Sequence, residues 1–474
     1  MQKFIILFFV AVLESVAVEA TAQTFTVLHT FTALDNSTNS DGVGPNALVL
    51  SGTTLYGTTE KGGSSSPGGT IFALNTDDTA FTTLYRFNGG DDGFLVNGGL
   101  ILWSNALYGT TRGGGSAGDG TAFAFNSSIG YTNLHNFIDS PNNASFPYAG
   151  LILSGNTLYG TASEEFTQSD GKVFALNTDG TGYTNLHAFT GGDGISPYAK
   201  LVLSGTTLYG TTRFGGKEFN GSLSSSSGTV FALNTDSTGF TNLYSFTPIP
   251  TSPPYTNSDG GNPLAGLVVG GSTLYGATDA GGSGGLGTVF ALNRNGTGFT
   301  VLHSFSGDGD GAYPTTLILS GDTLYGITHG INVGGSTSNI GTVFKVNTDG
   351  SGFTSLHSFS AIPSSPPYTN TDGANPSSLI LSGNALYGTT SYGGDYGNGT
   401  VFSLFIQPQL KIIPAGPNVI LTWPTNAIGF TLQSTTNLLA PVWATNSPLP
   451  VLVNGQNTVT NQISGTQQFY RLSQ

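Results

Sequence analysis

The sequence predicts an all-β protein: a seven-bladed β-propeller closed by its own N-terminal strand and followed by a small C-terminal β-sandwich. Three observations predict this fold: a motif that recurs along the chain, four strand-like runs in each repeat, and complementary chain ends. The motif is Leu-Tyr-Gly, and its tyrosines are Tyr56, Tyr108, Tyr159, Tyr209, Tyr275, Tyr325 and Tyr387. A unit of about fifty residues with four short strands is typical of a propeller blade.

The fourth repeat shows the four strand-like runs clearly. They are LVLSG at 201–205, TLYGTT at 207–212, GTVFALN at 228–234 and FTNLYSF at 240–246. Both faces of a blade pack on neighbouring blades, so the Leu and Tyr of the motif can point to opposite faces and both be buried. We expect the glycine after Tyr to allow close approach of the blades near the axis. The motif therefore indicates architecture rather than chemistry.

The two ends of the repeat region complement each other. The segment FTVLHTF at 25–31 matches the fourth strand of a repeat, yet it precedes the first copy of strand one. The seventh repeat stops after its third strand, which contains Val401 and Phe402. The N-terminal strand would therefore complete the last blade, and the ring would close without an open sheet edge.

The chain divides into three parts. Residues 1–22 predict a signal peptide, because Lys3 precedes a short apolar run and Ala20-Thr21-Ala22 forms a small-residue cleavage site. Residues 23–405 form the propeller. Residues 406–474 form the sandwich-like module, a candidate for sorting, anchoring or adhesion, with Trp423 and Trp443 as expected core anchors. The chain contains no cysteine, which excludes disulfides and a lipoprotein-type anchor.

Charge and histidine placement limit the function classes. The chain has 26 acidic and 12 basic residues and no Lys/Arg cluster, so nucleic-acid binding is disfavoured. Five histidines occupy one position of strand four, where two other repeats have Tyr85 and Tyr244. These histidines are His29, His135, His187, His303 and His357. Equivalent positions around a ring cannot converge on one metal or substrate, so we expect packed aromatic side chains with one hydrogen bond each.

Aspartates precede glycine in the connections between repeats. They are Asp41, Asp92, Asp193, Asp259, Asp310 and Asp372. Turn formation is the interpretation we prefer to metal binding. We predict no catalytic residue, no metal and no cofactor.

Several recurring segments together resemble a known family. The segments LYGTT, GTVFALN and FTxLHSF, with GG pairs and DGxxP before strand one, are similar to the GloVer-type tandem repeats of secreted bacterial proteins. The resemblance covers roughly residues 25–405. It implies a secreted or cell-surface location and a varied C-terminal anchoring or sorting module, and it brings no activity that can be carried over.

The residue that follows each LYGTT-like strand varies between repeats. These residues are Glu60, Arg112, Ser163, Arg213, Asp279, His329 and Ser391. A ring would place them on one face around the axial opening, together with the long loops, and loops carry function more often than the scaffold does. The alternative is that they are ordinary solvated loop residues.

Two proline-rich insertions lie on the same predicted face. They span 248–263 and 361–376 and contain Tyr255 and Tyr368, which are candidate anchors for sugars or proteins. They could equally pack over the blade edge. The candidate ligand-binding residues are Arg112, Arg213, Asp279, His329, Tyr255 and Tyr368.

Three functions remain open. The first is a non-catalytic extracellular or cell-surface protein, a monomer without a membrane span after signal removal, that binds a glycan or a protein. The second is a carbohydrate-active hydrolase or lyase, which would need a pair of carboxylates. Glu164 and Glu165 are adjacent and point apart in an extended chain, so they form a poor pair. The third is a structural component of the cell envelope.

Overall fold

The structure is a computed structural model. It describes residues 23–36, 38–63, 68–163, 170–223, 226–333, 336–363, 368–408, 410–424, 430–437, 441–446, 448–453, 456–462 and 468–473. The predicted signal peptide and the Glu164–Glu165 pair lie outside these residues. Within this part of the chain, no helix is long and apolar enough to cross a membrane.

Repeats one to six each form one four-stranded antiparallel sheet in which consecutive strands are neighbours. Repeat one contains β2 (Val43–Ser51), β3 (Thr54–Lys61), β4 (Thr70–Asn75) and β5 (Thr82–Arg86). Repeat two contains β6 (Ile101–Trp103), β7 (Ala106–Thr111), β8 (Thr121–Asn126) and β9 (Gly130–Asn136). Repeat three contains β10 (Ile152–Ser154), β11 (Thr157–Ala162), β12 (Lys172–Asn177) and β13 (Thr184–Ala188). Repeat four contains β14 (Val202–Ser204), β15 (Thr207–Thr212), β16 (Thr229–Asn234) and β17 (Thr241–Ser245).

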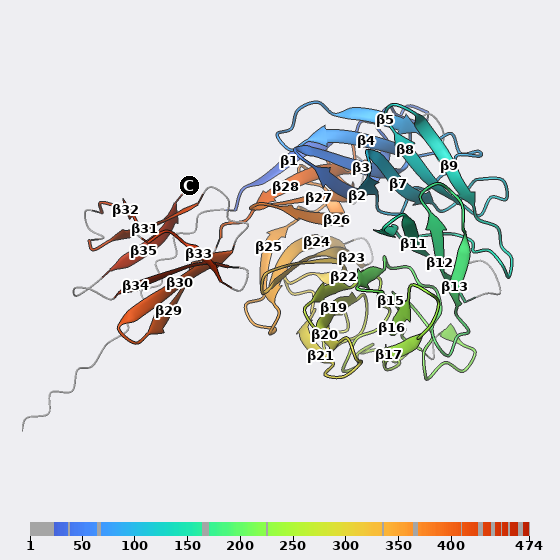
Figure 1. Cartoon of the computed structure of the whole chain (residues 1–474). Coiled ribbons are helices and arrows are strands. Elements are labelled where there is room, and N and C mark those ends of the chain that lie inside the picture. The colour runs from blue at the N-terminus through green and yellow to red at the C-terminus, as the bar shows by residue number, and fades with distance from the viewer. Residues whose placement is uncertain are drawn as a thin grey trace, which may run out of the picture.

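The remaining repeats follow the same plan, and the sheets stand around a common centre (Figure 1). Repeat five contains β18 (Val268–Gly270), β19 (Thr273–Thr278), β20 (Thr288–Asn293) and β21 (Thr300–Ser304). Repeat six contains β22 (Ala312–Ser320), β23 (Thr323–Val333), β24 (Ser336–Asn347) and β25 (Thr354–Ser358). Repeat seven contributes β26 (Ala374–Ser382), β27 (Ala385–Tyr392) and β28 (Thr400–Phe405). The fold is thus all-β and propeller-like.

The N-terminal strand completes the sheet of repeat seven. Strand β1 (Phe25–Thr30) pairs antiparallel with β28, with Thr26 opposite Ser403. The ring of Phe25 stacks on His357 of repeat six at a centroid distance of 3.8 Å. On the other side, Phe31 is fully buried in a cluster with Leu55 and Phe72 of repeat one. The predicted pairing of the first strand with the last repeat is confirmed.

The apolar core lies between neighbouring sheets. One cluster, for example, joins Ile71 and Phe87 of repeat one to Leu107 and Phe123 of repeat two. Leu107 and Tyr108 are adjacent in the motif and both buried, as the two-faced packing of these sheets requires. The prediction that both residues of the motif are buried is confirmed in this repeat.

The glycine of the motif has a different role from the one predicted. A Cβ atom on Gly57 would lie 2.3 Å from Cζ of Phe72 and 2.7 Å from the carbonyl oxygen of Ala47. Both contacts belong to the same sheet as Gly57. The expectation of close approach between blades is therefore wrong here, because this glycine makes room for a buried phenylalanine of its own sheet.

The C-terminal residues form two further sheets. One contains β29 (Lys411–Ala415), β30 (Asn418–Pro424), β34 (Gln456–Gln462) and β33 (Val451–Val453), in that order. The other contains β32 (Ala444–Thr445), β31 (Thr431–Thr435) and β35 (Phe469–Ser473). Trp423 and Leu432, one from each sheet, share a buried cluster. Trp443 is not a core anchor, because it is only partly buried and lies 4.3 Å beneath the guanidinium of Arg471.

Candidate functional site

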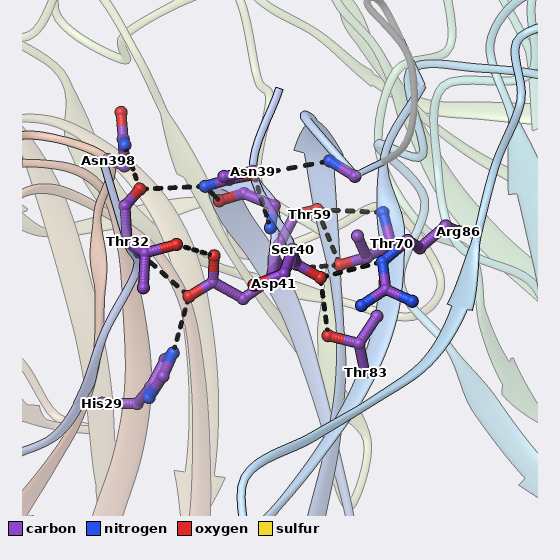
Figure 2. Close-up of polar contacts among 12 residues, drawn as sticks. His29, Thr32, Asn39, Ser40, Asp41, Thr59, Thr70, Thr83, Arg86 and Asn398 are labelled. Atoms are coloured by element: carbon purple, nitrogen blue, oxygen red, sulfur yellow. Dashed lines mark hydrogen bonds and ion pairs between the residues drawn. The ribbon is translucent and has the colours of Figure 1, made fainter. Parts of the chain in front are cut away.

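The connections between repeats are held by aspartate (Figure 2). Asp41 accepts hydrogen bonds from the backbone N–H of Thr32 at 2.9 Å and from its hydroxyl at 2.5 Å, and lies 3.2 Å from Nε2 of His29. Burial would raise the pKa of Asp41, but the bonds from His29 and Thr32 outweigh it and lower that pKa. Gly42 follows at φ +104°, where an added Cβ would overlap the Thr59 side chain. The Asp-Gly pair is therefore a structural turn.

The same arrangement recurs around the ring. His187 lies 2.9 Å from Asp193, and Tyr85 donates to Asp92 at 2.9 Å. The other equivalents are His303–Asp310, His357–Asp372, Tyr244–Asp259 and His135–Asn143. Each ring also stacks on an aromatic ring of another repeat, as His187 does on Phe240 at a centroid distance of 3.6 Å. The interpretation of these histidines as packed aromatic side chains with one hydrogen bond is confirmed.

All the repeats contribute to one cavity of about 380 Å³, which we call the axial cavity. Its lining comes from two positions of the repeat. The first is the residue directly after the LYGTT-like segment, and it supplies Glu60, Arg112, Arg213, His329 and Ser391. The second lies two or three residues before the first-strand leucine, and it supplies Asn46, Asn97, Tyr148, Tyr198, Leu264, Thr315 and Ser377. Because every repeat is represented, the cavity lies on the axis of the ring.

The first of these two sets was predicted from the sequence, and the second was not. The sequence does mark the second set, because in six of the seven repeats its residue directly follows a proline, as Tyr198 follows Pro197. In repeat two it follows Val96 instead. The type of this residue changes between repeats while its surroundings stay the same, as expected of a position that does not serve the scaffold.

Arginines and tyrosines of different repeats meet at the axial cavity. The guanidinium of Arg112 lies 5.7 Å from the ring centre of Tyr148, and that of Arg213 lies 5.7 Å from the ring centre of Tyr198. These are cation–π distances. Each pair presents a positive charge beside a flat aromatic face, which suits a polar ligand with an apolar face.

The ionisable groups near Arg213 are shifted by burial. Asp279 does not line the cavity but lies with Oδ2 4.0 Å from Nη2 of Arg213. Burial raises the pKa of Asp279 to about 6, although the charge of Arg213 opposes this shift. Burial also lowers the pKa of His329 to about 4, so this imidazole is neutral at pH 7.

Three buried polar atoms of the cavity lining have no hydrogen-bond partner among the described residues. They are Nε of Arg213, Oδ1 of Asn97 and Oγ1 of Thr315. Buried polar atoms in folded proteins are almost always hydrogen-bonded, to protein or to water. These three are therefore available to water or to a ligand that enters the cavity.

The two candidate tyrosines lie apart from the axial cavity. Tyr255 is 51% exposed and lines a lateral groove of about 460 Å³ with Ile249, Leu286 and Tyr313. This groove shares no lining residue with the axial cavity. Tyr368 is 57% exposed and lines neither of them. Of the six predicted binding residues, the structure thus brings Arg112, Arg213 and His329 together.

Comparison with known proteins adds a family and two similar folds. No curated protein matches the sequence. Among solved structures, the chain is similar to an oligogalacturonate lyase in complex with manganese, with TM-score 0.47 and 11% identity over 81% of this chain and 97% of that chain. It is also similar to a chain of a nidogen/laminin complex, with TM-score 0.38 and 15% identity over 65% of this chain and 92% of that chain. The Gloeobacter/Verrucomicrobia repeat matches residues 15–224 and 221–402, and the chain therefore belongs to this repeat family.

Proposed function

We propose that this protein is a secreted or cell-surface binding protein without catalytic activity, which holds a polar ligand, a glycan or part of a protein, in the axial cavity. The observation that carries the proposal is the convergence of the variable residues of every repeat on this one cavity. Scaffold positions of the repeat vary little, as His and Tyr do in strand four, whereas the cavity is lined by Glu, Arg, Tyr, His, Asn, Thr, Ser and Leu. Varied polar groups around a concave site are typical of ligand recognition.

The proposal assumes a complete ring. We infer that the four-stranded sheets are the seven blades of a propeller, that β1 closes it, and that the two C-terminal sheets form a small sandwich. The pairing of β1 with β28 and the cluster shared by Trp423 and Leu432 support these assignments. The signal peptide at 1–22 accounts for export.

Binding is favoured over hydrolysis by the carboxylates near the cavity. Glycosidases of the usual type need two carboxyl groups that flank the scissile bond. Among the described lining residues only Glu60 carries a carboxylate, and it lies 3.4 Å from the ammonium group of Lys61. A purely structural role does not account for the different side chains that the repeats place around the cavity.

A glycan array tests the proposal. The mature chain 23–474 is compared with an Arg213→Met/Asp279→Asn double variant, which removes both charges so that no unpaired carboxylate remains. We expect at least about tenfold weaker retention, since charge-assisted hydrogen bonds contribute roughly 1.5–3 kcal/mol. The matched control is Arg294→Met, because Arg294 lies in a short turn and donates to Ser204 at 2.6 Å.

Each outcome of the array assigns a different function. Equal retention by the wild type and the double variant would exclude the axial cavity as the binding site. Cleavage of a polysaccharide by the wild type would favour the enzyme hypothesis. If the wild type neither binds a glycan on the array nor cleaves a polysaccharide, a structural envelope protein would be favoured.

A further inference from the structure

A single lysine lies in the channel below the axial cavity. This deep channel of about 540 Å³ shares Asn46, Tyr198, Leu264, Thr315 and Ser377 with the axial cavity, so the two are continuous. Its wall includes the residue directly before the first-strand leucine of each repeat. These residues are Ala47, Gly99, Gly150, Lys200, Gly266, Thr316 and Ser378. Six repeats place a small residue there, and repeat four places Lys200.

Packing does not explain Lys200. Glycine or alanine fills the equivalent position in four of the other repeats, so the sheet does not need a long side chain there. Lys200 is exposed to the channel, and the surrounding protein lowers the pKa of its ammonium group. No described residue forms an ion pair with Lys200. Its charge is therefore available to an anionic ligand that enters the channel.

The axial cavity, which joins this channel, also carries positive charge. Arg112 and Arg213 line it, although the chain as a whole has only 12 basic residues against 26 acidic ones. The one lining carboxylate, Glu60, faces Lys61, and the nearby Asp279 faces Arg213. The lining of the two cavities thus holds three cations, Lys200, Arg112 and Arg213, and one carboxylate, and an excess of positive charge in a cleft concentrates anionic ligands.

Uncharged polar groups near these cations can form hydrogen bonds with the hydroxyl groups of a ligand. Oδ1 of Asn97 and Oγ1 of Thr315 lack partners, and the latter lines both cavities. Tyr198 also lines both cavities, but its ring is buried beneath Arg213 and against Tyr148. Hydroxyl-bonding groups and a cation together match a polyhydroxylated ring that carries a carboxylate.

We propose that the axial cavity binds a sugar acid, such as a uronic acid unit, whose carboxylate is held by Lys200 in the deep channel and whose hydroxyl groups face Asn97 and Thr315. The proposal rests on the proposed function and specifies its ligand. The Lys200–carboxylate contact orients the ring, and Arg213 adds positive charge in the axial cavity.

Calorimetric titration with D-galacturonate and D-galactose tests this proposal. The two sugars differ at C6, which bears a carboxylate in one and a hydroxymethyl group in the other. We expect the full mature chain to bind galacturonate at least tenfold more tightly than galactose. Lys200→Met should abolish this preference by weakening galacturonate binding at least tenfold, and Lys200→Arg should preserve most of it. Because other repeats have small uncharged residues at this position, Lys200→Met should fold normally, which its unfolding temperature checks.

The outcomes separate the ligand proposal from the proposed function. Equal affinity for both sugars, or a preference that survives in Lys200→Met, would overturn the role of Lys200 while leaving glycan binding in place. No binding of either sugar would overturn the sugar-acid proposal. If the array were also silent, the proposed function would fail with it.

Discussion

His187 shows how one repeated position can carry either of two side chains. It stacks on Phe240 and bonds to Asp193, while Tyr85 and Tyr244 make the same kind of bond to Asp92 and Asp259. A flat ring with a polar atom at its far end satisfies both requirements. The sequence was sufficient to predict this role, because the alternation of His and Tyr at one position excludes proton transfer as the common purpose.

The substitution His187→Tyr should therefore be tolerated. We expect a change in unfolding free energy within about 0.5 kcal/mol, whereas His187→Leu should cost about 1–2 kcal/mol because Asp193 loses a hydrogen bond. Chemical denaturation of the two variants measures both values. Equal losses in the two variants would show that the hydrogen bond contributes nothing.

Asp279 should make stability depend on pH. Its folded-state pKa is raised to about 6 from 3.8, so the folded state binds more protons than the unfolded state between these values. The free energy of unfolding is therefore highest at low pH, where Asp279 is protonated, and it falls as pH rises through about 6 and Asp279 ionises. Asp279→Asn stays neutral, so we expect it to match the wild type near pH 4 and exceed it by about 2–3 kcal/mol near pH 7.5.

The control for Asp279 is an exposed aspartate. Asp308 lies in a loop and is exposed, so Asp308→Asn should follow the wild type across the whole pH range. Thermal unfolding at several pH values checks both variants. A constant difference between Asp279→Asn and the wild type would contradict the raised pKa.

At the scale of single elements, β1 decides whether the ring is closed. The sequence predicted its partner because a fourth-strand pattern stood at the wrong end of the chain. Two smaller predictions failed for physical reasons. Gly57 accommodates Phe72 within its own sheet, and Trp443 lies under Arg471 at the surface. Neither contact could be predicted from spacing, since each depends on how side chains of separate strands interlock.

Closure can be measured with a pair of cysteines, because the chain has none of its own. Thr26→Cys/Ser403→Cys places the pair directly opposite on β1 and β28. The matched control, Ala232→Cys/Thr241→Cys, occupies the equivalent places on β16 and β17. Loop-closure entropy predicts a gain of about 6 kcal/mol for the closing pair and about 3 kcal/mol for the control.

Failure of the closing pair to oxidise, while the control pair does, would contradict ring closure by β1. Unfolding temperatures of the oxidised and reduced forms provide the comparison. A similar gain for both pairs would show that the ends of the ring are already constrained in the unfolded chain.

At the scale of the whole molecule, the axial cavity exists only because the sheets stand around a common centre (Figure 1). Sequence analysis placed Arg112, Arg213 and His329 around the axis, since all three follow the same strand. It did not find Tyr198 or Lys200, because knowing which side chains face the axis requires the path of the chain before each first strand. The lateral position of Tyr255 was missed for a similar reason, since the insertion at 248–263 folds beside Leu286 and Tyr313.

Gly99 and Gly192 allow the most direct test of the axial site. Neither glycine has a positive φ, and a Cβ atom on either would meet no other atom within 4 Å. Gly99 lines the deep channel, whereas Gly192 is exposed in a loop outside it. We would measure, by titration calorimetry, the affinity of Gly99→Trp and Gly192→Trp for the glycan that the wild type retains on the array. If the ligand extends from the axial cavity into the deep channel, the indole at position 99 fills the channel and abolishes binding, while Gly192→Trp binds like the wild type. Undiminished affinity of a folded Gly99→Trp variant would contradict binding along the axis.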